Sequence, residues 1–246
     1  MKFIFIPLLG VVMFVVGCSP AVKRDNPQAH YMLGDSYLRS GDPTSALREF
    51  LLAENIEPDD LNLQSGLGHV YLLKKAYIES EQHYKYALEL DPQNPRTQNN
   101  LAALYVEMER YDDAIKYFQL AAENYVFSRP EVSWTGIGYA EFKKGNHTAA
   151  LNAFGKAISV NWRFPDVYVR RGDVYFDLGE TDKALADYKM ALDHAPNFVS
   201  AHYSLALALM KKRDIDQAVI HLETVIALAP DSPLSQQSKT FLKVLK

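Results

Sequence analysis

The sequence predicts an all-α protein, a right-handed superhelical solenoid of six paired-helix repeats followed by a capping helix. Three observations indicate this fold. A small residue recurs at spacings of 34, 34, 36, 34 and 34 residues, at Gly34, Gly68, Ala102, Gly138, Gly172 and Ala206. Around each of them, apolar residues return with the spacing of two amphipathic helices. Proline, which ends helices, recurs late in the frame at Pro58, Pro92, Pro196 and Pro230.

Composition speaks against a nucleic-acid partner, an internal disulfide and a cysteine-based zinc site. The chain has 246 residues, a formal net charge of -4 and a single cysteine. The charge gives no reason to expect a nucleic-acid partner. One cysteine can form neither an internal disulfide nor a cysteine-based zinc site.

The first element in chain order is a predicted signal peptide, residues 1–17. Lys2 supplies the positive start, and residues 3–17 are uncharged and mostly apolar. Fifteen helical residues rise about 22 Å, which is short of the ~30 Å hydrocarbon layer of a bilayer. A cleaved leader is therefore favoured over a spanning helix. The alternative, an ordinary signal peptide or spanning helix with an incidental cysteine, stays open.

The end of this leader, "VVGC" at residues 15–18, resembles the lipobox of bacterial lipoproteins. The resemblance implies cleavage before Cys18, a diacylglycerol thioether on Cys18, and acylation, by palmitate or a similar chain, of the new amino terminus. Ser19 follows where an aspartate would signal inner-membrane retention in some bacteria. We therefore expect a lipid-anchored, periplasm-facing protein of the outer membrane.

A polar segment joins the lipid-attachment site to the repeats. The tether, residues 18–26, ends in "SPAVKRDN". These last eight residues reach at most about 28 Å. The solenoid is thus predicted to stay close to its membrane.

The six repeats span residues 27–232. Small residues at the eighth, twentieth and twenty-seventh positions let paired helices approach closely, and a bulky twenty-fourth residue fills the space between them. This frame resembles the tetratricopeptide repeat, which implies stacked helix pairs with the first helices lining the concave face. The predicted repeats are 27–60, 61–94, 95–128, 131–164, 165–198 and 199–232.

The last element is a predicted capping helix, residues 233–246. Phe241, Leu242 and Leu245 share one face of it. Because terminal repeats need an outer shield, this face is expected to cover the sixth repeat.

No catalytic constellation emerges from the sequence. "GLGHVY" and "GIGYAE" look like phosphate-loop fragments, but both fall in mid-helix without a preceding strand. No histidine lies four residues from another, so a helical zinc pair is not expected. We predict no catalytic residue, no cofactor and no metal, and a protein that is not an enzyme.

The predicted function is protein binding through the concave surface. Residues three or four apart on a helix share a face, which places positions 2, 5, 9 and 12 of the first helices there. The predicted groove residues are Tyr31, Asp35, His69, Asn99, Tyr139, Phe142, Asp173, Tyr203 and Leu207. The lysine and asparagine of repeats that bind chaperone tails are absent. A mixed groove with tyrosines suits a peptide or strand with apolar anchors.

One junction departs from the period. Between the third and fourth repeats the chain reads "ENYVFSRPE", two residues longer than elsewhere. Aromatic residues gather here and in the next junction and form a possible binding hot spot: Tyr125, Phe127, Trp162 and Phe164. Packing alone is the alternative. Trp134 is expected to pack in the core.

Two charged residues replace apolar repeat residues on neighbouring first helices. Glu141 stands where the repeats carry tyrosine, and Arg171 where they carry leucine. They are predicted to form a partly buried ion pair. Tolerated surface charges are the alternative.

The leader and the six repeats together resemble the pilot lipoproteins of type IV pilus systems, best over residues 99–158. The resemblance implies a partner, the secretin subunit, whose localisation and multimerisation the protein promotes. Two other possibilities stay open. One is a general periplasmic scaffold that recruits peptidoglycan or barrel-assembly enzymes, and the other is an accessory enzyme subunit.

Overall fold

The computed structural model describes residues 26–245. This part of the chain forms thirteen α-helices and no strand. They are α1 (Pro27–Arg39), α2 (Pro43–Glu54), α3 (Leu61–Leu73), α4 (Tyr77–Leu90), α5 (Pro95–Glu107), α6 (Tyr111–Ala122), α7 (Pro130–Lys143), α8 (His147–Val160), α9 (Pro165–Asp177), α10 (Thr181–His194), α11 (Val199–Lys211), α12 (Ile215–Leu228) and α13 (Pro233–Leu245). The predicted leader, Cys18 and most of the tether lie outside the described residues.

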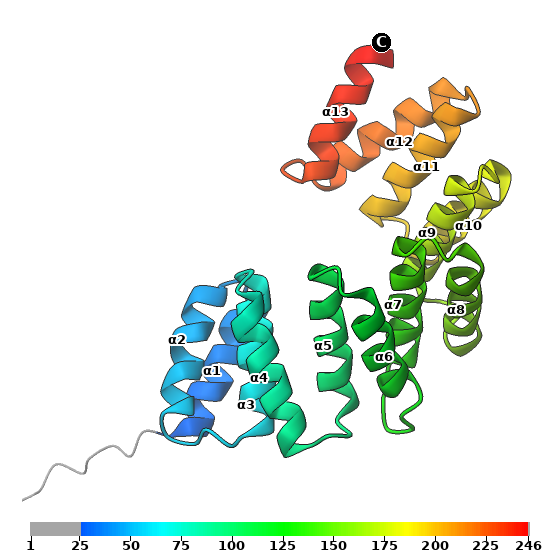
Figure 1. Cartoon of the computed structure of the whole chain (residues 1–246). Coiled ribbons are helices and arrows are strands. Elements are labelled where there is room, and N and C mark those ends of the chain that lie inside the picture. The colour runs from blue at the N-terminus through cyan, green and yellow to red at the C-terminus, as the bar shows by residue number, and fades with distance from the viewer. Residues whose placement is uncertain (1–25, 246) are drawn as a thin grey trace, which may run out of the picture.

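The helices pair in sequence order and stack into an open, curved array (Figure 1). Each odd-numbered first helix from α1 to α11 packs against the even-numbered second helix that follows it. Successive first helices also contact one another, and each second helix packs on the next first helix. The predicted all-α solenoid of paired helices is confirmed.

The helix starts follow the sequence frame closely. Five first helices begin at the first residue of a predicted repeat, and α7 begins at Pro130, one residue before the predicted start. Side-chain oxygens cap several of these starts: Asn26 accepts from two backbone N–H groups of α1, and Asp60 accepts from the N–H of Leu63 at 2.7 Å. Such caps satisfy donors that have no partner inside the helix.

The eighth and twenty-fourth repeat positions meet inside each helix pair. Gly68 lies against Tyr84, which is fully buried, and a Cβ on Gly68 would stand 2.7 Å from the Tyr84 ring. Gly138 lies against Phe154 in the same way, and a Cβ on Gly138 would stand 2.4 Å from the Phe154 ring. The small residue therefore sets how closely the two helices approach, as the sequence predicts.

The capping helix α13 packs against α12 and α11. Its Ser235 and Ser238 are buried, and the ring centroid of Phe241 lies 6.5 Å from that of Tyr203 on α11. The C-terminal end of the solenoid is therefore covered by a helix of this chain.

Candidate functional site

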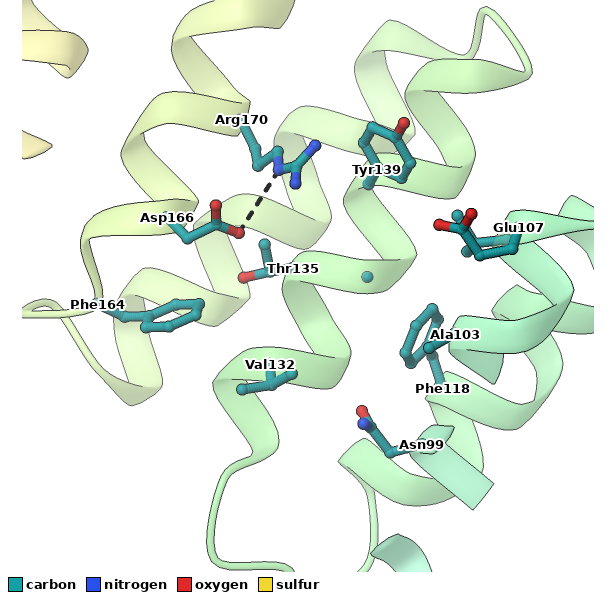
Figure 2. A pocket seen from close by; sticks show the side chains of 12 residues that line it. Asn99, Ala103, Glu107, Phe118, Val132, Thr135, Tyr139, Phe164, Asp166 and Arg170 are labelled. Atoms are coloured by element: carbon teal, nitrogen blue, oxygen red, sulfur yellow. Dashed lines mark ion pairs between the residues drawn. The ribbon is translucent and has the colours of Figure 1, made fainter. Parts of the chain in front are cut away.

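A cavity of about 290 Å³ lies between α5, α7 and α9, on the side where first helices contact one another (Figure 2). The cavity joins helices from both sides of the irregular junction, because α5 comes before that junction in the chain and α7 and α9 come after it. The cavity is lined by Asn99, Ala103, Val106, Glu107, Phe118, Val132, Thr135, Gly136, Tyr139, Phe164, Asp166 and Arg170.

A glycine lets a buried ring reach the cavity. Gly136 has no side chain, and a Cβ there would stand 2.5 Å from the Phe118 ring, so the ring takes the space that a larger residue would need. Phe118, from α6, is nearly fully buried and reaches the cavity past this glycine. With Ala103 and Val132, it gives the cavity an apolar floor that would hold an apolar side chain of a partner.

Polar groups stand around this floor. Arg170 forms an ion pair with Asp166, one turn earlier on α9, with 3.5 Å between Nε and Oδ2. Its guanidinium also lies over the Tyr139 ring, 4.6 Å from the centroid, as Figure 2 shows. An arginine held in this way keeps donors for backbone carbonyls or a carboxylate of a bound segment.

The predicted groove residues are only partly brought together. Asn99 and Tyr139 line the cavity, and Ser133 donates a 2.8 Å hydrogen bond to Asn99 Oδ1. Phe142 instead faces the ring of His147 at the start of α8, 5.8 Å between centroids. His69 is exposed on α3 and lies outside the cavity lining.

The groove residues near the two ends make local contacts. In the first repeat, Tyr31 stacks on Phe50 and Asp35 pairs with Arg39. In the sixth repeat, Tyr203 lies near the α13 residue Phe241, and Leu207 is half-buried.

Asp173 on α9 is a groove residue whose pKa is shifted by its surroundings. It accepts hydrogen bonds from the Tyr188 hydroxyl at 2.9 Å and the Ser204 hydroxyl at 3.3 Å. Burial raises the pKa of its carboxyl above the ordinary value, and the Tyr188 hydrogen bond opposes this shift. Asp173 is thus tied into the packing between the fifth and sixth repeats.

The four junction aromatics differ in exposure and surroundings. Phe164 lines the cavity, whereas Tyr125 is fully exposed and Trp162 is 55% exposed. Phe127 is half-buried in the α6–α7 connection. Trp134 packs against the core clusters on both sides of the junction, as predicted.

The predicted ion pair between Glu141 and Arg171 is wrong. Arg171 binds Asp187 of α10 through two hydrogen bonds, of 2.8 Å from Nε and 2.7 Å from Nη2. Glu141 accepts from the side-chain amide of Asn146 at 2.7 Å. The second helix of the same repeat therefore supplies the partner of Arg171. The hydrogen bonds from Arg171 to the Asp187 carboxylate raise the pKa of the guanidinium.

Several cavity residues lie outside positions 5, 9 and 12, from which the groove residues were predicted. Asp166 and Arg170 occupy positions 2 and 6 of the fifth repeat, and Glu107 lies at the end of α5. Position 2 was a recognisable signal, because it belongs to the concave set of the repeat.

In residues 26–245, no three His, Cys, Asp or Glu side chains are grouped to hold a metal, and no helix is long and apolar enough to cross a bilayer.

Family models match most of the chain. A model described as TPR repeat matches residues 138–179 and 172–213. Three models described as tetratricopeptide repeat match residues 71–133, residues 21–56 and 31–95, and residues 199–232. Together they cover residues 21–133 and 138–232.

Curated relatives share the repeats at low identity. The chain is 24% identical over 208 residues to the BBSome complex member BBS4 of Bos taurus, covering 83% of this chain and 39% of the relative. It is 22% identical over 148 residues to the type IV pilus assembly protein PilF of Pseudomonas aeruginosa, covering 60% of this chain and 59% of the relative. The chain thus spans less than two thirds of either relative.

Two solved structures share the arrangement of helices over nearly their whole length. The structure of Pseudomonas aeruginosa PilF superposes with a TM-score of 0.70 at 20% identity, over 87% of this chain and 96% of that chain. PilW, described as a widely conserved type IV pilus biogenesis factor, superposes with a TM-score of 0.75 at 16% identity, over 86% and 97%. At these identities the likeness shows the fold.

Proposed function

The chain belongs to the tetratricopeptide-repeat proteins, and on that premise we propose that it is a lipid-anchored scaffold of type IV pilus biogenesis. In this proposal it sits at the outer membrane, faces the periplasm and holds a segment of the secretin subunit while that subunit multimerises. The cavity between α5, α7 and α9 would hold an apolar side chain of the segment, with Arg170 beside the segment's backbone.

One observation carries the proposal. The match to pilus biogenesis proteins extends over nearly the whole length of PilF and PilW, rather than over one or two repeats. The sequence relationship to PilF and the lipobox-like "VVGC" point the same way. The cavity supports a binding role, because an apolar hollow flanked by a few polar groups is the usual form of a binding site.

The lipid anchor has a physical role in this scheme. Each buried CH₂ of an acyl chain contributes about 0.8 kcal/mol, and two or more chains anchor stably where one binds marginally. Because the chain carries a net negative charge, anionic lipid would not retain it. Acylation at Cys18, which lies outside the described residues, would therefore hold the complex at the membrane.

Two experiments test the proposal. Deletion of the gene should abolish heat-resistant secretin multimers on a gel, and unchanged multimers with normal pili would reject a pilot role. In the second experiment, Ala103→Phe fills the cavity and should weaken capture of the secretin subunit roughly tenfold. Ala29→Phe, on an exposed position of α1, is the matched control and should leave capture unchanged.

A further inference from the structure

The connection between α6 and α7 presents two adjacent apolar side chains to solvent. Its tip, defined here as residues 124–127, carries Tyr125 at 104% relative exposure and Val126 at 80%. Isolated exposed apolar side chains are ordinary on protein surfaces. Two adjacent ones at the end of a protruding connection form a candidate contact point.

Hydrogen bonds hold this tip in one conformation. The side-chain amide of Asn124 donates to the backbone carbonyl of Gln93, in the preceding inter-repeat connection, at 2.9 Å. Asn124 Oδ1 accepts from the N–H of Val126 at 3.0 Å, and the N–H of Phe127 donates to the Asn124 carbonyl at 3.1 Å. A tip ordered in advance loses less conformational entropy when it binds.

The tip lies at a defined edge of the solenoid. Because paired helices are antiparallel, every connection from a second helix to the next first helix lies at the edge where the first helices begin. Figure 1 shows the start of α1 and the α6–α7 connection at the same lower edge. Only residues 19–26 separate Cys18 from α1, a reach of at most about 28 Å. A lipid at Cys18 would therefore keep this edge near a bilayer.

The chemistry of the edge suits the headgroup region of a bilayer. Tyrosine and tryptophan favour that region, since one end of each side chain is apolar and the other polar. The next connection along the same edge carries Trp162, and the Arg163 guanidinium lies 4.6 Å from its ring.

Charges of both signs lie around the tip. Arg129 pairs with Glu131, with 3.5 Å between Nε and Oε1, and the basic Arg96 stands with the acidic Asp91 and Glu123. Because these residues carry no excess of positive charge, they give the tip no electrostatic preference for anionic lipid, so apolar insertion would supply the contact energy.

We propose that the tip, Tyr125 and Val126 foremost, is a second membrane contact that inserts into the headgroup region of the bilayer to which the lipid anchors the chain. This inference rests on the lipid anchoring put forward under the proposed function. The contact fixes which edge of the solenoid faces the membrane, and so leaves the cavity between α5, α7 and α9 open to a partner.

The test uses residues 19–246 with a hexahistidine tag in place of Cys18, which retains every described residue. The protein is bound to phosphatidylcholine and phosphatidylethanolamine vesicles that contain a nickel-chelating lipid. Val126→Cys then provides the single thiol for an environment-sensitive fluorophore. Asp112→Cys, exposed at the opposite end of α6, is the matched control.

The label at position 126 should shift its emission to the blue on vesicles and be quenched by nitroxide-bearing lipids, while the label at 112 does neither. Replacing Tyr125 and Val126 together by serine should speed release from vesicles with sparse nickel lipid roughly tenfold. Equal emission at the two positions, or unchanged release, overturns the proposal. So does a label at 126 that responds only to an added envelope protein.

The anchor is tested separately, by the mass of the protein purified from cells that can acylate it. Absence of acylation rejects the lipid anchor, whereas the vesicle measurement reports on the tip alone. The two failures are therefore distinguishable.

Discussion

Replacing Arg171 with leucine removes the partner of a buried carboxylate. Asp187 is 6% exposed and receives both hydrogen bonds from this guanidinium, at 2.8 and 2.7 Å. Removing one member of a buried pair costs about 3–5 kcal/mol, because the other charge stays buried. The Arg171 side chain is itself 25% exposed, so water would enter more easily, and we expect the free energy of unfolding to fall by about 3 kcal/mol.

The double replacement Arg171→Leu with Asp187→Leu should recover most of this loss. Leucine is the residue that other repeats carry at the position of Arg171, as at Leu67 and Leu101. Two apolar side chains of similar volume in place of a buried pair are often neutral or stabilising. The coupling free energy in the double-mutant cycle should therefore reach about 2 kcal/mol.

Urea unfolding followed by far-ultraviolet circular dichroism measures the four proteins of the cycle. Because stacked repeats do not always unfold in one step, hydrogen exchange in α9 and α10 should accompany it. A coupling below about 0.5 kcal/mol would refute the reasoning, since sites without shared partners differ by that much from additivity. So would an equally strong coupling between Arg171 and Glu141, whose carboxylate binds Asn146 instead.

Two further predictions concern the packing and the pH response. Gly68→Ala should destabilise the protein by about 1 kcal/mol in the same urea assay, because a Cβ would stand 2.7 Å from the buried Tyr84 ring. Gly155→Ala is the matched control within a helix, since no atom lies within 4 Å of its Cβ position. It should stabilise the protein by about 0.5–1 kcal/mol. Burial, with a smaller effect of neighbouring His202, lowers the pKa of His221 below its ordinary 6.5. The unfolded chain therefore binds more protons just below that pH, so the free energy of unfolding should fall on acidification through this window, and less steeply in His221→Gln.

The spacing of the repeats in the sequence predicts much of the fold. A period of 34 residues with small residues at fixed positions requires helix pairs that pack closely, so Gly68 facing Tyr84 could be expected from position alone. Local signals set the helix starts, because a proline or a capping residue such as Asp60 acts within one turn. The irregular junction was also visible in the sequence as two extra residues.

The candidate site was predicted only in part. Asn99 and Tyr139 line the cavity as concave positions should, but Phe142 turns toward α8. Periodicity gives the face of a helix on which a residue lies. It does not give the direction of a side chain at the helix end, where the next turn begins.

The sequence by itself determined the class of fold, the number of repeats and the close contact within each helix pair, because these follow from residue size and period. Tertiary structure alone decided that Arg171 pairs with Asp187 and that Phe118, packed on Gly136, lines a cavity together with Arg170. The physical reason is that these contacts join different helices. Their distances depend on how each helix is rotated and shifted against its neighbour, and one period in the sequence does not specify that.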